Sequence, residues 1–361
     1  MPNKFNADHR HHIPKMQHFV RNWPEYESGL RNRGSLTFWV TPQAMQLWPA
    51  QARSTPGGQS IYSNQAIQTS LMLRLVFGQA LRQTEGLMRS IFQPLEIDLK
   101  APDHTTLSRR SMTLKALPRQ CALPAGALHL LIDSTGLKLF GAGEWLQKKH
   151  GQKSRRSWRK LHLAVDASTG HIEASVLTGQ DVDDPSQVGP LLDQIEHEVA
   201  SVTADGAYDG EPTYERIAQR DTQIDVIIAP RVTAQPSAQF EAAPTTRDNH
   251  LLMIQSLGRL EWQEAYGYGK RALVETTMGR FKAIIGPKLR ARDPRGQQAE
   301  ANAAVAVLNR MLSAGRPNSV RTSAAAVNRS KDDTPQHFPV QRRNGDVNGR
   351  RVATLLQCRL Y

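Results

Sequence analysis

Three carboxylates in this chain stand where they could share divalent cations. Asp133 follows the apolar run LHLLI and Asp205 follows SVTA, so each comes directly after a segment typical of a β-strand. Glu275 is the lone acid among the bases of YGKRALVETTMGRFK. Divalent ions such as Mg²⁺ prefer carboxylate oxygens, and a pair of them can activate an attacking oxygen and stabilise a leaving one. These acids therefore predict metal-dependent phosphodiester chemistry.

Each acid has a specific expected role. Asp133 would bridge two Mg²⁺ ions, for which Mn²⁺ is a plausible substitute, while Asp205 and Glu275 would each ligate one ion. The alternative for Asp133 and Asp205 is an ordinary turn residue, because Asp before small residues is common in turns. We interpret Asp166 and Asp209, which lie near the same motifs, as turn residues.

The basic stretch around Glu275 predicts a helical face that follows phosphates. Tyr268, Arg271, Glu275 and Lys282 fall within about 60° of one another on a helical wheel. On such a face, Arg271 would hold a phosphate as a fork and Lys282 as a point charge. The alternative is a solvated helix face on which Glu275 pairs with an arginine one turn away.

The middle of the chain has the element order of a ribonuclease H-like α/β fold. Three strand candidates lie in LHLLIDSTGLKLF, WRKLHLAVD and HIEASVLTG, and a helix, the strand SVTA, a helix and the strand IDVII follow. An antiparallel meander followed by α/β crossovers makes a mixed sheet in which the first and fourth strands are neighbours. Asp133 and Asp205 should therefore face one cleft.

A short polar helix before this domain resembles a recognition element. Asp103 can cap a helix that carries Thr105, Ser108, Arg109 and Arg110, and apolar residues at helical spacing precede it. Hydroxyls and arginines on the last helix of such a region are typical of helix-turn-helix proteins. An ordinary surface helix is the alternative.

A second basic segment, residues 148–160, lies between the first two strand candidates. Its residues Lys153, Arg155 and Arg156 could neutralise DNA phosphates. The alternative is a solvated hairpin tip, and in either case we expect Trp158 in the core.

These patterns divide the chain into four segments. We expect an N-terminal extension (1–58), a small helical, helix-turn-helix-like DNA-binding region (59–122), a ribonuclease H-like catalytic domain (126–315) and a disordered basic tail (316–361).

The composition points to a polyanionic partner inside a reducing compartment. The net charge of +13 favours nucleic acid. The two cysteines are far apart, which excludes a disulfide framework and a cysteine-rich zinc site. No apolar run is long enough to span a membrane, and no signal peptide is evident, so we expect a cytoplasmic protein.

The motifs resemble those of a known family. Tyr268, Arg271, Glu275 and Lys282 match the Y-(2)-R-(3)-E-(6)-K signature of bacterial insertion-sequence DDE transposases. The segments DSTGLKLFGAGEW, RRSWRKLHLAVD, ADGAYDG, RGSLTFWV and PDHTTLSRR look like those of the insertion-sequence-five family. The resemblance runs from about residue 20 to about residue 322, and residues from about 323 onward depart from it, as a readthrough or out-of-frame extension would.

The resemblance implies a transposase with an acidic triad of Asp133, Asp205 and Glu275. Such an enzyme binds terminal inverted repeats of its element, requires Mg²⁺, and cleaves and transfers strands into double-stranded target DNA. We expect a homodimer in the active complex, acting on bacterial chromosomal DNA. Two alternatives stay open: a DNA-binding protein that keeps the fold without activity, and a structure-selective nuclease of the same fold.

Overall fold

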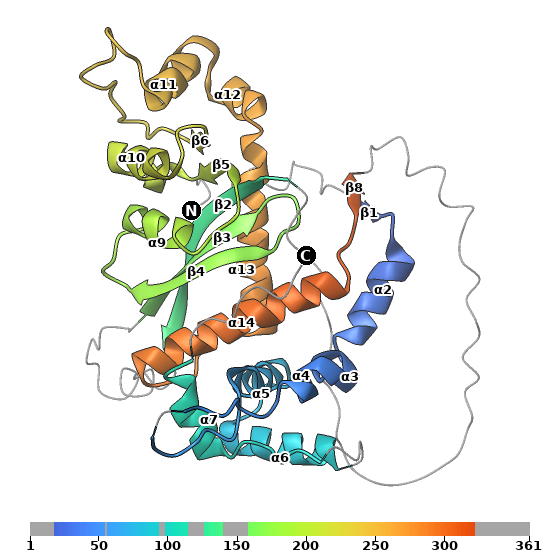
Figure 1. The fold of residues 1–361 in the computed structure, drawn as a ribbon. Coiled ribbons are helices and arrows are strands. Elements are labelled where there is room, and N and C mark those ends of the chain that lie inside the picture. Colours follow the sequence, from blue (N-terminus) through green and yellow to red (C-terminus); the bar gives the residue numbers. More distant parts are fainter. Residues whose placement is uncertain (1–17, 55, 94–97, 115–125, 140–157, 322–361) are drawn as a thin grey trace, which may run out of the picture. The chain divides into compact units, whose positions relative to one another are not determined.

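The computed structural model describes residues 18–54, 56–93, 98–114, 126–139 and 158–321 (Figure 1). The described residues divide into two compact units, one with residues 18–21 and 317–321 and the other with the described residues between 22 and 316. In the first unit, β1 (His18–Val20) pairs antiparallel with β8 (Ser319–Arg321). The strand β8 lies in the segment 316–361, which the sequence predicted to be disordered. Pairing with β1 satisfies its backbone hydrogen bonds. Residues 322–361 lie outside the described residues.

The second unit contains the predicted ribonuclease H-like sheet. Its strand order is β4-β3-β2-β5-β6, with β7 paired to the end of β2. The β2–β3 and β3–β4 pairs are antiparallel, whereas β5 pairs parallel with both β2 and β6. The mixed α/β fold class is thus confirmed, including the adjacency of the first and fourth strands. The strands are β2 (Leu128–Leu139), β3 (Trp158–Asp166), β4 (Ile172–Gly179), β5 (Val199–Ala204), β6 (Asp225–Ile228) and β7 (Lys288–Leu289).

Short crossover helices cover one face of the sheet. Alternate residues of β2 and β5, such as Ile132 and Val202, pack there against Leu191 and Ile217. Proline in the first turn helps to start two of these helices because its φ angle is already helical. The connections contain η2 (Pro185–Gln187) and α9 (Val188–Leu192) before β5, then η3 (Gly206–Tyr208) and α10 (Glu211–Arg220) before β6.

Two long helices cover the opposite face. They are α13 (Ala272–Ile284) and α14 (Pro294–Ala314). The strand residues that alternate with those of the first face, such as Leu131 and Leu163, are buried in one core with Phe281 of α13 and Leu308 of α14. The side chains that point to this face therefore include the odd-numbered positions of β2 near Asp133.

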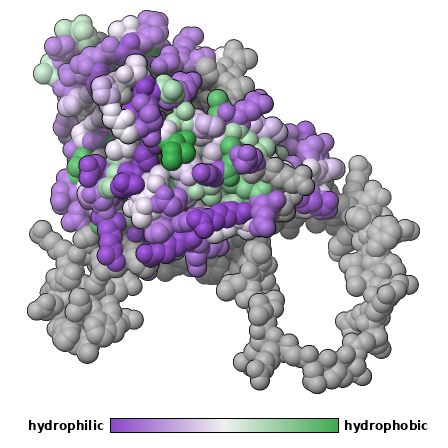
Figure 2. Space-filling view, turned by 60° about the horizontal axis from the view of Figure 1, so that its bottom comes forward, coloured by the Kyte–Doolittle hydropathy of each residue, from purple (hydrophilic) through white to green (hydrophobic). Residues whose placement is uncertain are grey.

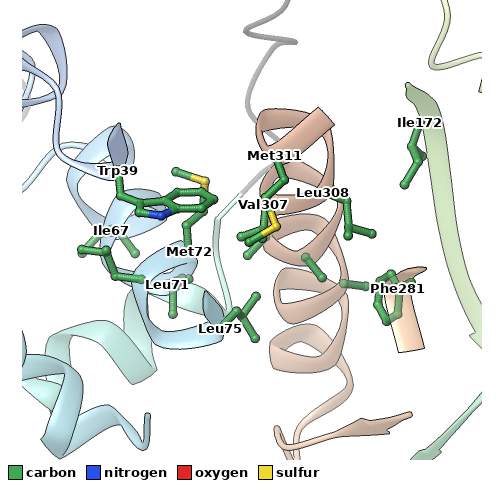
Figure 3. Packing of buried hydrophobic residues seen from close by; sticks show 14 of the residues in the cluster. Trp39, Ile67, Leu71, Met72, Leu75, Ile172, Phe281, Val307, Leu308 and Met311 are labelled. Atoms are coloured by element: carbon green, nitrogen blue, oxygen red, sulfur yellow. The ribbon is translucent and has the colours of Figure 1, made fainter. Parts of the chain in front are cut away.

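Helices from the N-terminal half pack on the other side of α14. Figure 3 shows Trp39, Leu71 and Leu75 facing Val307 and Met311, while Phe281 lies beyond α14. Apolar side chains of the expected N-terminal extension, helical region and catalytic domain thus share one core. The limits 1–58, 59–122 and 126–315 stay predictions. The helices are α2 (Trp23–Asn32), α3 (Leu36–Trp39), α4 (Pro42–Gln46), α5 (Asn64–Val76), α6 (Leu81–Phe92) and α7 (His104–Ser111).

The predicted recognition helix exists, with Asp103 as its cap. The Asp103 carboxylate accepts hydrogen bonds from the backbone N–H groups of Thr105 and Thr106. However, α6 ends at Phe92 and α7 begins at His104. That connection is longer than the three- or four-residue turn of a helix-turn-helix motif.

Between β6 and α13 the chain forms α11 (Thr246–Leu257), α12 (Arg259–Ala265) and η4 (Tyr268–Arg271). Its core is aromatic: Trp262 is fully buried and donates a hydrogen bond from Nε1 to Nδ1 of His250 at 2.9 Å. His250 Nε2 in turn lies 2.8 Å from the carbonyl of Val226 in β6. This chain of contacts attaches the segment that carries η4 to the edge of the sheet.

Polar residues dominate the surface that Figure 2 shows, where hydrophobic residues form small groups between hydrophilic ones. None of the helices in the described part of the chain combines the length and the apolar character needed to cross a bilayer.

Candidate active site

Asp133 and Asp205 occupy matching positions on neighbouring strands. In the parallel β2–β5 pair, Ile132 lies opposite Ala204, and the two aspartates are the next residues on their chains. Ile132 and Ala204 point into the core beneath α9 and α10, so alternation directs both aspartates to the face covered by α13. Asp133 accepts a hydrogen bond from its neighbour Ser134 N–H at 2.7 Å, and Asp205 caps η3 through Ala207 N–H at 2.9 Å.

Glu275 reaches the same region through Arg271. Arg271 is the residue that precedes α13, and Glu275 lies one turn into the helix. The guanidinium donates from Nη2 to Glu275 Oε1 at 2.5 Å and from Nη1 to Asp133 Oδ2 at 3.4 Å. The Glu275 side chain is 56% exposed and that of Asp133 only 18%. Arg271 therefore links a buried acid to a solvent-facing one.

The electrostatics of Asp133 reflect this crowding. The pKa of Asp133 is raised from an ordinary 3.8 to about 6. Burial is the largest cause, the charges of Asp205 and Glu275 act in the same direction, and the Ser134 N–H and Arg271 act to lower it. A carboxylate that is disfavoured by burial and by two like charges is one that a bound cation would stabilise.

Tyr268 lies beside the acids and rests on the aromatic core of the preceding helices. Its ring centroid is 5.1 Å from that of Trp262. Burial raises the pKa of Tyr268, with Asp205 and Asp133 adding to the effect and Arg271 opposing it. The Trp262–His250 contact thus fixes the start of η4, and through η4 it positions Arg271.

Lys282 stands apart from these contacts. It lies seven residues beyond Glu275 on the same helix, which is about 10 Å along the axis. The helix packs through Val274, Met278 and Phe281 on its buried side.

The predicted DNA-binding residues of α7 differ in what they contact. Ser108 and Arg109 are exposed. Thr105 donates its hydroxyl to Asp103 as part of the cap. Arg110 holds the start of α5, with Nη1 bonded to the Tyr62 carbonyl at 3.0 Å and Nη2 to Asn64 Oδ1 at 2.8 Å.

The predicted contacts Lys153, Arg155 and Arg156 lie outside the described residues. Trp158, expected in the core, is half-buried at the start of β3, where its ring covers Gly136 and lies 5.5 Å from Lys138 Nζ. A strand end has core on one side only, which explains why this position is not fully enclosed.

A polar cluster behind the two aspartates was not foreseen from the sequence. Tyr208, three residues after Asp205, is 1% exposed, and within the described residues its hydroxyl has no hydrogen-bond partner. Burial raises its pKa, and the charges of Asp184, Asp133 and Asp205 raise it further. Asp184 accepts from Lys160 Nζ at 3.2 Å and lies 3.8 Å from Nδ1 of the buried His162. Asp184 directly precedes η2 and also faces this cluster.

The two acids interpreted as turn residues, Asp166 and Asp209, differ from each other in their contacts. Asp166 closes the turn after β3 by accepting from the N–H and the hydroxyl of Thr169, as expected. Asp209 is buried and forms an ion pair with Arg247, whose Nε lies 2.7 Å from its Oδ1. The partner lies far along the chain, so no local pattern could reveal this pair.

The donor chemistry of the acids fits a divalent cation, but Glu275 does not yet lie with Asp133 and Asp205. Within the residues that the structure describes, no three Asp, Glu, His or Cys side chains are grouped closely enough to hold a metal ion. Arg271 explains the difference, because its guanidinium lies between Asp133 and Glu275. Asp133 and Asp205 are neighbours already, whereas Glu275 would have to leave Arg271 to join them.

Comparisons with known proteins place these residues in context. Two family models, each described as a transposase DDE domain, match residues 124–310, more than half of the chain, and residues 31–142. The first match spans β2 to α14 and so includes all three acids. Among solved structures, the cryo-EM structure of a piggyBac transposase synaptic complex with hairpin DNA is similar at 11% sequence identity and a TM-score of 0.38. The match covers 82% of this chain and 77% of that chain.

Proposed function

Because this chain belongs to the transposase DDE domain family, whose members are DNA-cleaving and strand-transferring enzymes, we propose that it acts at the ends of an insertion sequence. In this proposal, it binds the terminal inverted repeats, cuts DNA there in a metal-dependent reaction and joins the ends to double-stranded target DNA. It works as a homodimer, one protomer for each end, on the chromosome in the cytoplasm of a bacterial cell.

Asp133, Asp205 and Glu275 are the catalytic and metal-binding residues of the proposal. The observation that carries it is the convergence of Asp133 and Asp205, next to the paired Ile132 and Ala204, with Glu275 joined to Asp133 by Arg271. Asp133, Asp205 and Glu275 would together hold two Mg²⁺ ions, or Mn²⁺ in their place. Divalent ions held there would supply Lewis acidity for the attacking water or hydroxyl and for the leaving 3′-oxygen.

The remaining site residues would handle the DNA backbone. Arg271 can exchange its carboxylate partners for a phosphate, since its fork fits either group. Tyr268 presents a hydroxyl next to the acids, from a ring fixed on Trp262. Lys282 would contact a phosphate farther along the strand, about two helical turns from Glu275. Contacts outside the reacting bond would come from Ser108, Arg109 and the basic segment with Lys153, Arg155 and Arg156. Thr105 and Arg110 would contact DNA while keeping the hydrogen bonds that they make within the protein.

The test uses three isosteric variants, Asp133→Asn, Asp205→Asn and Glu275→Gln, on DNA with the element's inverted repeats. Each should lower Mg²⁺-dependent cleavage at least a thousandfold, while Kd for the same DNA without divalent ions changes by less than about threefold. Glu264→Gln, an exposed acid of α12, is the control and should cleave normally. Full cleavage by any of the three variants would sink the assignment.

Two further measurements separate the proposal from its alternatives. A DNA-binding protein without activity would bind the repeats and leave them intact with Mg²⁺ or Mn²⁺. A structure-selective nuclease would cut branched DNA without a footprint on the repeats and without a strand-transfer product.

Light scattering of the protein–DNA complex should give two protomers, and a complex with one protomer would contradict the dimer.

A further inference from the structure

A pocket of about 340 Å³ lies away from the three acids, between α5, α7 and the start of α14. Apolar side chains of α5 and α14 form much of its wall. Arg74 from α5, Arg290 and Arg292 from the turn before α14, and Ser108 from α7 add hydrogen-bond donors. Arg290 Nη1 already donates to the Gly78 carbonyl, and the Ser111 hydroxyl to the Ser108 carbonyl. Segments that are more than two hundred residues apart in sequence therefore bring the guanidinium groups of Arg74 and Arg292 and the Ser108 hydroxyl to one place.

Arg74 and Arg292 form no ion pair within the described residues, and Arg74 Nε is buried there without a hydrogen bond. Burial lowers the pKa of Arg74, although Glu300 acts in the opposite direction. A half-buried guanidinium without an ion pair is costly, and a bound anion would offset that cost.

The acids in the pocket wall are already engaged. Both Glu300 oxygens accept the Arg290 N–H at 3.0 Å, and one also accepts the Ala291 N–H at 2.9 Å. Asp293 caps α14 and accepts from Arg295 N–H at 2.9 Å. These carboxylates accept from the backbone of the turn and form no ion pair with Arg74 or Arg292 within the described residues, although the Glu300 charge acts on Arg74.

The lining determines the chemistry of the ligand. Guanidinium groups are donors only, and the Ser108 hydroxyl can donate as well, so the ligand must be an anion rich in acceptors. A phosphate group meets this requirement and fits the fork of an arginine. The pocket is larger than one phosphate, which leaves room for the sugar attached to it.

The place of the pocket indicates the source of that phosphate. Ser108 belongs to the helix predicted to contact DNA, and Arg109 beside it is exposed. On the other side, Arg290 and Arg292 follow β7, which pairs with Lys138 and Leu139 at the end of β2. We propose that this pocket binds a phosphate of the DNA backbone, clamped between α7 and the start of α14. The choice of DNA as the source rests on the proposed function.

The experiment compares Arg74→Gln and Arg292→Gln with Arg82→Gln. Arg82 is exposed on α6 and does not line the pocket, so its variant removes the same charge elsewhere. Arg292 is exposed, so its variant should fold even if Arg74→Gln does not. Binding of inorganic phosphate is measured by calorimetry, and binding of an inverted-repeat duplex is measured at several salt concentrations.

Arg74→Gln and Arg292→Gln should each weaken phosphate binding at least tenfold and DNA binding about fivefold to tenfold. Each should also reduce the salt dependence of DNA binding by about one released counterion. Arg82→Gln should bind phosphate as the unmodified protein does.

Three results would overturn the inference in whole or in part. Normal phosphate and DNA binding by both pocket variants would refute the site, even if the Asp133, Asp205 and Glu275 variants behave as proposed. Lost phosphate binding with unchanged DNA binding would refute DNA as the source and identify a site for free phosphate. Failure of the unmodified protein to bind DNA at all would refute the proposed function, while the phosphate measurement would still decide whether the pocket binds an anion.

Discussion

Arg271 Nη1 lies 3.4 Å from Asp133 Oδ2, although 138 residues separate the two in sequence. The same guanidinium is bonded to Glu275, so two of the three acids share one cation. A divalent ion and Arg271 would therefore compete for the same carboxylates. This competition leads to the first two predictions.

Asp133 should destabilise the fold above pH 6. Its pKa is raised from an ordinary 3.8 to about 6, so the folded state holds the proton more tightly, and stability is lost as pH rises through this window. The full difference corresponds to about 3 kcal/mol. We expect Asp133→Asn to raise the free energy of unfolding at pH 8 by about 1–3 kcal/mol and to have little effect at pH 4. Urea unfolding at both pH values measures this.

Mg²⁺ supplies the matching control. It should raise Tm of the unmodified protein at pH 8 and leave Tm of Asp133→Asn unchanged. Below about pH 6 its affinity should fall about tenfold for each pH unit, because one proton competes for Asp133. Equal free energies of unfolding for the two proteins at pH 8 would show that the Asp133 charge does not destabilise the fold.

Arg271→Gln should raise the pKa of Asp133 above about 6, because the Arg271 charge acts to lower it. Carboxyl carbon chemical shifts followed over pH measure the change directly. The same variant should bind Mg²⁺ about tenfold more tightly without DNA, since the competing cation is gone, yet cleave DNA poorly. Lys282→Gln removes an equal charge from the same helix and should alter neither the pKa of Asp133 nor Mg²⁺ binding. If it shifts both as strongly as Arg271→Gln, the contact between Arg271 and Asp133 is not the cause.

The Asp209–Arg247 pair should stabilise the turn that carries Asp205. The Asp209 side chain is 1% exposed and that of Arg247 14%. Arg247→Ala would leave a buried carboxylate without its partner and should cost about 3–5 kcal/mol. Arg216→Ala breaks the exposed pair with Asp193 and should cost less than about 1 kcal/mol. Chemical denaturation compares the two, and the double variant Asp209→Asn/Arg247→Ala should recover part of the loss. A cost below that of Arg216→Ala would contradict a structural role.

Glycine variants test how closely α2 packs on the end of α14. A Cβ at Gly29 would lie 2.5 Å from the Ala314 carbonyl oxygen, so Gly29→Ala forces backbone apart and should cost about 1–3 kcal/mol. Gly86 is exposed within α6 and has open space around its Cα. Gly86→Ala should therefore stabilise the protein by up to about 1 kcal/mol. Thermal unfolding should move in opposite directions for the two, and equal shifts would show that α2 does not pack as described.

Local patterns in the sequence predicted the strands β2 to β6 and the helices that cross between them. They did not predict α11, α12 or β7. The order of elements then predicted the strand order, because handed crossovers leave few ways to close such a sheet. Asp133 and Asp205 could be placed side by side for that reason.

The sequence alone determined the types of the proposed catalytic groups and their places at strand ends and on one helix. Only the tertiary structure decided what surrounds them: Arg271 lies between Asp133 and Glu275, and Arg247 pairs with Asp209. Behind Asp205, the Tyr208 hydroxyl has no hydrogen-bond partner among the described residues. The tertiary structure also decided that Arg110 holds α5, and that Arg74 and Arg292 meet at one pocket. The physical reason is that periodicity reports which way a side chain points along its own element. Ion pairs and buried charges depend on what other elements bring opposite it.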